Sequence, residues 1–235
     1  MFQVEPKARC ALLVFASDLA SDLSHRHLPN RLAPLLAIPR FAPAEVGGDV
    51  HLFTTRRTSA NENVTVHSQR GRSFGERLEN AVETLALRGY DRIVIVGRDV
   101  PQLAAADVRT ALAALNSHRL VLGPDHRGGC WLIALHTRDR SQLFGGIHWQ
   151  QNTDFNQLAS RVANDELLTL DVKIDLDRWQ DARLLARVHD LARALIEPSL
   201  SLPNHTELPR HSANLPFAHR QRPPPAFFLP VVVAA

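Results

Sequence analysis

The chain has 235 residues, of which 45% are hydrophobic and 22% charged, as expected for one globular domain with or without an appendage. Its net charge of +3 comes from arginines scattered among acidic residues rather than clustered on one element, so we expect no nucleic-acid partner. No apolar run approaches the ~20 residues that a membrane-spanning helix needs. We therefore expect no membrane partner and a cytoplasmic location. The two cysteines, Cys10 and Cys130, have neither metal-binding spacing nor the density of a disulfide framework, and are expected to be buried thiols.

Short apolar runs predict a series of β-strands. The first, Ala11 to Ala16, is continuous and contains β-branched and aromatic residues, which favours a strand buried on both faces over a signal peptide. The strongest is Asp91 to Gly97. The other strands are expected at residues 50–55, 63–67, 118–123, 130–135 and 167–172.

Helices are predicted between these strands. Ser73 to Arg88 begins with a capping box, Ser73 with Glu76, and ends before Gly89. Further helices are expected at residues 104–116, 156–164 and 179–196, and residues 17–43 are expected to be irregular.

Alternating strands and helices predict a three-layer α/β/α sandwich with a mostly parallel sheet. We expect this domain to span residues 1–197. The last 38 residues contain eight of the fifteen prolines and no periodicity, so residues 198–235 are predicted to form a disordered tail.

Acidic residues after two of the predicted strands are candidate metal ligands. Asp99 follows the apolar run 91–97, and ligands of parallel sheets bind at the carboxyl ends of the strands. A carboxylate there can hold Mg²⁺ against phosphate oxygens, or simply cap the next turn. Asp175 and Asp177 would point the same way from an extended segment, while Asp181 fits a helix cap better.

Two glycine-containing loops are candidate ligand contacts. Gly128 and Gly129 lie between two strands, where paired glycines allow close approach to a ligand or simply form a hairpin. Gln69, Gly71 and Gly75 lead into a predicted helix N-terminus, which can bind anions.

Several blocks together resemble a family of uncharacterised bacterial proteins of the glycosyltransferase-A-like, nucleotide-diphospho-sugar transferase superfamily. The blocks are QRGRSFGERL, VIVGRDVPQL, LGPDHRGGCWLIAL, LFGGIHWQ and DLDRWQDA, in this order within residues 10–190. The resemblance implies a nucleotide ligand and Mg²⁺ or Mn²⁺ as cofactor, with Asp99 and Asp175 as metal ligands and Asp99 and Asp177 as catalytic carboxylates.

The resemblance also implies contacts with the nucleotide and the substrate. Gln69, Arg98, Gly128 and Gly129 are expected at the nucleotide or its phosphates, and Trp131 and Trp149 near the substrate. The family's Gly and Lys in the first loop are missing, so Arg31 or Arg98 would have to supply the cation, since arginine grips phosphate bidentately. Arg127 stands where the family has Asp, and Arg178 where it has Thr.

Three functions remain open from the sequence. The first is a metal-dependent glycosyltransferase that uses a nucleotide-sugar donor. The second is a nucleotidyltransferase that joins an NTP to a phosphorylated small molecule, which the poor phosphate loop disfavours. The third is a non-catalytic binding module, which the Arg127 and Arg178 changes allow.

Overall fold

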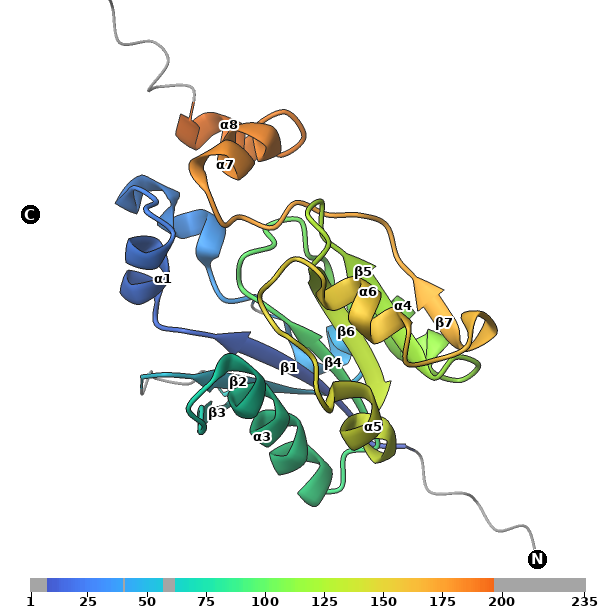
Figure 1. Cartoon of the computed structure of the whole chain (residues 1–235). Helices are drawn as coiled ribbons and strands as arrows, with labels where there is room; N and C mark the ends of the chain where they lie inside the picture. Colours follow the sequence, from blue (N-terminus) through green and yellow to red (C-terminus); the bar gives the residue numbers. More distant parts are fainter. Residues whose placement is uncertain (1–7, 40, 57–61, 197–235) are drawn as a thin grey trace, which may run out of the picture. The chain divides into compact units, whose positions relative to one another are not determined.

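The fold is built on one seven-stranded sheet, seen in a computed structural model that describes residues 8–39, 41–56 and 62–196. The strands are β1 (Cys10–Ala16), β2 (Asp49–Thr54), β3 (Val64–Ser68), β4 (Arg92–Val96), β5 (Leu120–Pro124), β6 (Cys130–His136) and β7 (Leu167–Thr169). Their order is β3-β2-β1-β4-β6-β5-β7 (Figure 1). The predicted tail at 198–235 lies outside the described residues.

All neighbouring strand pairs are parallel except the two that β6 makes with β4 and β5. The expected mostly parallel sheet is therefore confirmed, with β6 inserted as its antiparallel member. From β1 the chain adds β2 and β3 on one side of the sheet, and it then returns to place β4 on the other side of β1. That reversal makes the carboxyl ends of β1 and β4 the topological switch point, where open α/β sheets bind ligands.

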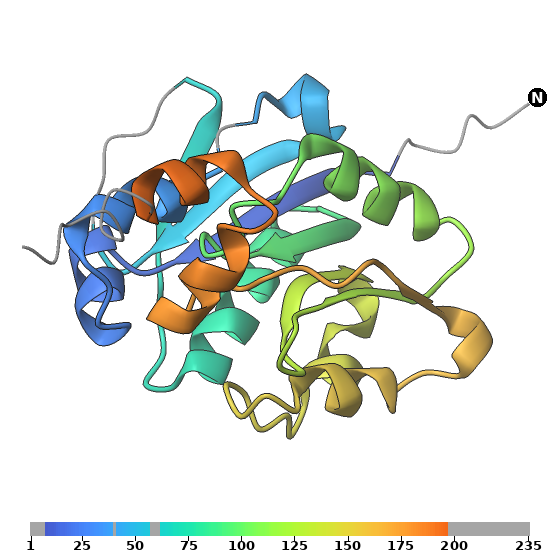
Figure 2. The same cartoon turned by 90° about the horizontal axis from the view of Figure 1, so that it is seen from above.

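Helices cover both faces of the sheet, as Figure 2 shows from above. One face packs against α3 (Phe74–Leu87), α5 (Arg140–Phe144) and α6 (Asp154–Ala159), and the other against α2 (Pro43–Val46) and α4 (Ala105–Ala114). Neighbouring residues in β1 alternate between the two cores, because successive strand side chains point to opposite faces. The expected α/β/α sandwich is therefore confirmed.

A third apolar cluster lies at the carboxyl end of the sheet. It joins α1 (Leu19–His25) and the 3₁₀ helix η1 (Asn30–Leu36) to α7 (Trp179–Leu185) and α8 (Asp190–Ile196). Its fully buried members come from η1, α7, α8 and the segment just before α7, and are Leu32, Leu36, Leu176, Ala182, Leu185 and Ala192. The cluster brings the segments after β1 and after β7 together beside the switch point (Figure 1).

Four sequence predictions are corrected by these elements. Residues 17–43 are not irregular, because Asp18 caps α1 through the Ser21 amide and η1 follows. The predicted helix 156–164 is α6 followed by the 3₁₀ helix η3 (Asn164–Glu166). The predicted helix 179–196 is interrupted between α7 and α8, with the break at residues 186–189. The two cysteines are partly rather than fully buried.

Among the described helices, none combines the length and apolar character needed to cross a bilayer.

Candidate active site

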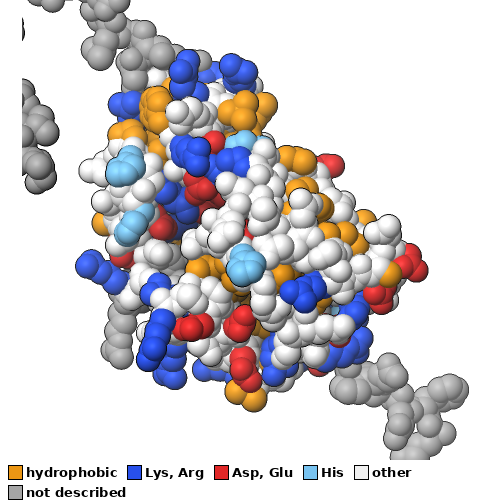
Figure 3. Space-filling view, in the orientation of Figure 1, with side chains coloured by type: hydrophobic (Ala, Val, Ile, Leu, Met, Phe, Trp, Pro, Cys, Tyr) orange, Lys and Arg blue, Asp and Glu red, His pale blue; other side chains and the backbone are white. Residues whose placement is uncertain are grey.

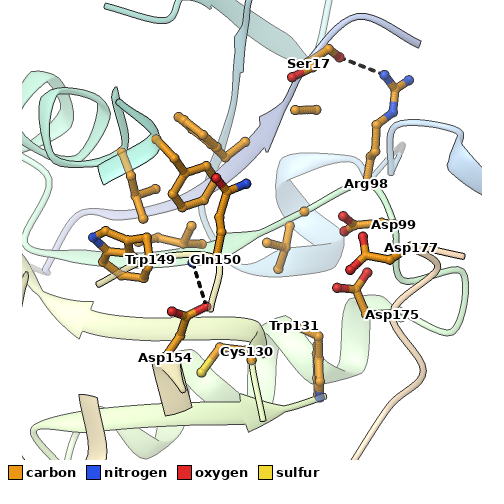
Figure 4. A pocket seen from close by; sticks show the side chains of 18 of the residues that line it. Ser17, Arg98, Asp99, Cys130, Trp131, Trp149, Gln150, Asp154, Asp175 and Asp177 are labelled. Carbon is orange, nitrogen blue, oxygen red and sulfur yellow. Dashed lines mark hydrogen bonds between the residues drawn. The ribbon is translucent and has the colours of Figure 1, made fainter. Parts of the chain in front are cut away.

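A cavity of about 420 Å³ opens at the carboxyl ends of β1 and β4. One end is acidic, with Asp99, Asp175 and Asp177 in its wall. The other end is aromatic, and its rings belong to Phe15, Phe74 and Trp149. Figure 4 shows the three carboxylates pointing toward one another, across the cavity from Trp149. The cavity can therefore hold a ligand that brings a cation to one end and has an apolar face at the other.

Asp99 is held at the end of β4 by its own turn and by the segment that follows β7. A side chain on Gly97 would place its Cβ 2.2 Å from Asp99 Oδ1, so only glycine there lets the carboxylate fold back over the strand end. The Leu176 amide donates to the Asp99 carbonyl at 2.8 Å. This backbone bond brings the acidic segment after β7 to the end of β4.

Asp99, Asp175 and Asp177 form a compact carboxylate triad. One oxygen from each lies within 4.8 Å of the others. Burial, and then the charges of Asp99 and Asp177, raise the pKa of Asp175 well above its usual range. Asp175 Oδ1 is buried and has no hydrogen-bond partner. A buried carboxylate oxygen without a donor is costly unless a ligand completes it, so the triad has the form of a cation site.

Two arginines also contact the triad. Arg26, just after α1, donates to Asp99 Oδ2 at 2.6 Å and to Asp177. Burial by itself lowers the pKa of Arg26, but the surrounding carboxylates, Asp99 foremost, outweigh burial and raise it. Arg127 contacts Asp177 and lies 3.6 Å from Asp175. In Figure 3 acidic side chains flanked by basic ones lie in the hollow between α1 and α7.

Asp181 connects this cluster to α7. Its Oδ2 accepts from the amides of Asp177 and Arg178 and from Arg127 Nη1, at 2.8–3.1 Å. Its Oδ1 lies 3.0 Å from His126 Nε2. The cap expected at Asp181 is therefore present. With all four carboxylates of the cluster ionised, the two guanidinium groups leave a formal charge of −2.

The loop between β5 and β6 is shaped by local contacts. Asp125 Oδ1 accepts from the amides of Arg127 and Gly129. Gly128 has φ +101°, and a Cβ there would lie 2.5 Å from the carbonyl oxygen of Asn152. Gly129 lines the cavity, whereas Gly128 packs against the loop that follows Trp149.

Of the other residues predicted for ligand binding, all but Arg31 line the cavity. Gln69, Trp131 and Trp149 line the cavity, although Trp131 is only 3% exposed and its indole donates to the Asp171 carbonyl. Arg98 also lines it, but its guanidinium points away from Asp99 and donates to the carbonyls of Ser17 and Leu36 (Figure 4).

Arg31, like Gly128, does not line the cavity. Its guanidinium carbon instead lies 5.2 Å from the centre of the Trp179 ring.

Several cavity residues were not singled out from the sequence, among them Arg26 and Asp154. Arg26 follows a short helix that the sequence did not predict, so its direction could not be inferred. The signal available was an arginine in the segment where the resembled family carries cations. Asp154 lies in a segment whose helix was expected to begin two residues later.

The sequence comparison confirms the family resemblance. Residues 43–151 match the family described as "Uncharacterized protein conserved in bacteria (DUF2064)". Curated protein sequences give no significant match.

Three solved structures have a similar fold. A protein from Desulfovibrio desulfuricans G20, proposed to be a nucleotide-diphospho-sugar transferase, has a TM-score of 0.65 and 21% identity, covering 81% of this chain and 98% of that one. Rv0371c from Mycobacterium tuberculosis H37Rv gives 0.51 and 19%, covering 76% and 97%. A nucleotidyl transferase from Methanothermobacter gives 0.52 and 14%, covering 79% and 98%. At these identities the likeness establishes the fold alone.

Proposed function

We propose that the chain is a divalent-metal-dependent glycosyltransferase that uses a nucleotide-diphosphate sugar. The observation that carries the proposal is the carboxylate triad Asp99, Asp175 and Asp177 in the wall of the cavity at the switch point. Asp99 and Asp175 are the proposed metal ligands, and Asp99 and Asp177 the carboxylates at the reacting diphosphate.

The residues fit a divalent cation. The triad supplies oxygen ligands, the residual charge of the cluster is negative, and Asp175 Oδ1 lacks a partner. Mg²⁺ and similar ions often use one or two carboxylates and complete their shell with water and substrate phosphates. When bound, such an ion offsets the charge that develops on a departing diphosphate.

Arg26 is the proposed phosphate contact in place of the lysine that the resembled family carries. It is the cation nearest the triad from the segment after β1, and its guanidinium already lies between Asp99 and Asp177. A fixed guanidinium can bind a phosphate through two parallel hydrogen bonds. Arg31, which packs on Trp179, is less well placed for that role.

The start of α1 favours a diphosphate over a triphosphate. A triphosphate cradle needs free backbone amides and cations after the first strand. Here the Ser21 amide is taken by Asp18 Oδ1, and the Asp18 amide donates to Thr55 Oγ1. The Asp18 carboxylate also places negative charge where further phosphates would bind.

Nucleotidyl transfer is the second candidate function. Arg72 and Arg77 line the same cavity as Arg26, so the chain can offer more than one cation to a longer phosphate chain. The two candidates differ in ligand, because one binds a diphosphate and the other a triphosphate most tightly.

A thermal-shift experiment separates these functions. Melting temperatures are measured for UDP, GDP, CTP and GTP, each with Mn²⁺ or with EDTA, on the wild type, Asp99→Asn and the exposed control Asp165→Asn. A ligand at 100 times its Kd stabilises by ~2.7 kcal/mol. For a domain of this size, that is a rise of roughly 5–10 °C.

The expected pattern is a Mn²⁺-dependent shift with UDP or GDP in the wild type and the control, but not in Asp99→Asn. A larger shift with a triphosphate supports nucleotidyl transfer instead. If no nucleotide shifts the wild type, both enzymatic functions are overturned and a non-catalytic binding module is left.

A further inference from the structure

Asp154 is a cavity carboxylate that the proposed metal site does not use. It is the first residue of α6 and lines the cavity together with Trp149 and Cys130 (Figure 4). Its Oδ2 accepts from the Gln150 amide at 3.3 Å. Its Oδ1 is buried and has no hydrogen-bond partner. Asp154 is therefore an incompletely satisfied carboxylate in the wall of the cavity.

The loop that leads into Asp154 has a constrained backbone. Gln150 and Asn152 have φ values of 64° and 56°, in the left-handed region that residues other than glycine seldom adopt. The Phe155 amide donates to the Gly128 carbonyl at 3.2 Å, and the Asn152 carbonyl packs against Gly128. Strained residues of this kind persist where the surrounding structure holds them, which is often at ligand sites.

The electrostatic surroundings make Asp154 a better proton acceptor than an exposed aspartate. Burial raises its pKa, two backbone amides lower it, and the neighbouring Asp125 raises it further, with a net upward shift. The thiol of Cys130, whose own pKa is raised by burial, is a further titratable group beside it. A carboxylate with a raised pKa takes a proton more readily in a transition state.

The aromatic residues beside Asp154 suit the apolar face of a sugar ring. The Trp149 ring lies 5.9 Å from Phe74 and 5.4 Å from Phe144, centre to centre, so its orientation is fixed by packing. A side chain on Gly75 would collide with the indole at 2.6 Å. Rigid aromatic faces of this kind bind ligands at small cost in conformational entropy.

We infer that Asp154 binds the hydroxyl group of a sugar or polyol acceptor beside Trp149 and receives its proton during transfer. This inference rests on the proposed glycosyl transfer. The acceptor oxygen forms a bond to the anomeric carbon of the donor sugar. The bond from that carbon to the diphosphate oxygen breaks, the electron pair leaves with the nucleoside diphosphate, and the hydroxyl proton passes to Asp154.

Binding of the acceptor is tested with three probes: methyl α-D-glucopyranoside, methyl α-D-mannopyranoside and methyl β-D-galactopyranoside. Saturation-transfer NMR titrations are run on the wild type, Asp154→Asn and the matched control Asp165→Asn. At least one probe is expected to bind the wild type and the control saturably. Its Kd should rise about tenfold or more in Asp154→Asn, the usual effect of losing a hydrogen bond to a charged group.

Proton transfer is tested in a transfer assay that uses the best-binding probe as the acceptor. The donor is UDP-glucose or GDP-mannose with Mn²⁺, and the rate is measured as the release of UDP or GDP. Asp154→Ala should slow transfer ~10²–10⁴-fold, the usual contribution of a general base. Added formate should restore part of that rate, which it would not do for a merely structural residue.

The inference fails if no probe binds the wild type, or if Asp154→Asn binds and transfers like the wild type. The Mn²⁺-dependent thermal shift with UDP or GDP keeps this failure distinct from failure of the proposed function. That shift should survive in Asp154→Asn, and its absence from the wild type would overturn the donor chemistry instead.

Discussion

Replacing Asp175 by Asn should stabilise the metal-free protein while removing its response to ligand. The triad oxygens lie within 4.8 Å of one another. At an effective dielectric constant of about 20, two unit charges at that separation repel by ~3.5 kcal/mol. Asp175 is repelled in this way by both Asp99 and Asp177. Arg127, at 3.6 Å, attracts it by ~4.6 kcal/mol at the same dielectric constant.

Arg26 offsets part of the remaining repulsion, so the expected net gain for Asp175→Asn is about 1–2 kcal/mol. A gain of that size raises the melting temperature of a domain this large by roughly 2–8 °C. Residues that destabilise a fold are tolerated where function requires them. The sign of this effect therefore tests whether the triad is built for a ligand.

The pH dependence follows from the raised pKa of Asp175. A group whose pKa is higher in the folded than in the unfolded state favours folding fully below its unfolded pKa, and that contribution is lost as pH rises through the folded pKa. The advantage of Asp175→Asn over the wild type should therefore be largest at neutral pH. It should shrink as the pH falls toward the unfolded value of 3.8.

Differential scanning fluorimetry in EDTA at pH 7.5 and pH 4.5 measures this, with Asp171→Asn as an exposed control on the same segment. With Mn²⁺ and UDP or GDP, the wild type and control should gain stability and Asp175→Asn should not. A lower melting temperature for Asp175→Asn in EDTA at pH 7.5 would refute the charge argument.

Three further predictions concern residues outside the triad. Burial, and then the neighbouring His67, lower the pKa of His51 to about 4. The free energy of unfolding should therefore decrease as the pH is lowered from 6.5 to 4. Urea titrations of His51→Phe should show a smaller decrease over the same pH range. Gly128→Ala should destabilise the domain by ~1–3 kcal/mol, because φ is +101° and the Asn152 carbonyl leaves no room for a Cβ; an unchanged urea midpoint would contradict this. Burial raises the pKa of the Cys130 thiol, so mass spectrometry after iodoacetamide treatment at pH 8 should find Cys130 alkylated far more slowly than in the urea-unfolded chain.

The sheet was the part of the fold best predicted from the sequence. Its strands are continuous apolar runs, such as Ala11 to Ala16, because a parallel strand between two helix layers is buried on both faces. The capping-box spacing of Ser73 and Glu76 likewise predicted the start of α3 within one residue, and Ser73 Oγ accepts from the Glu76 amide there. Local signals of this kind need no knowledge of the partner elements.

The elements at the carboxyl end of the sheet were harder to predict. The helix α1 has seven residues, and its one buried residue is Leu23, so helical periodicity is barely expressed. The break between α7 and α8 contains neither Gly nor Pro. These short elements are held by the apolar cluster that they share, which is a tertiary effect.

Only part of the candidate site could be predicted, because the rest of it depends on the same tertiary contacts. The carboxylates Asp99, Asp175 and Asp177 stand in motifs, and the structure brings them together. Arg26 and Asp154 reach the cavity only through α1 and through the loop after Trp149, whose directions no local pattern encodes. Whether the triad and its neighbours perform the proposed roles remains a prediction.

Electron paramagnetic resonance of Mn²⁺ tests the central proposal most directly, because bound ion loses the sharp signal of free ion. Titrations with and without UDP or GDP are compared for the wild type, Asp99→Asn and Asp165→Asn. We predict that the diphosphate tightens Mn²⁺ binding by the wild type and by the control. The amount of bound Mn²⁺ should exceed the amount that the diphosphate alone binds in protein-free buffer. Asp99→Asn should remove this gain. Equal Mn²⁺ binding by the wild type and Asp99→Asn in the presence of diphosphate would contradict the assignment of the triad as the metal site.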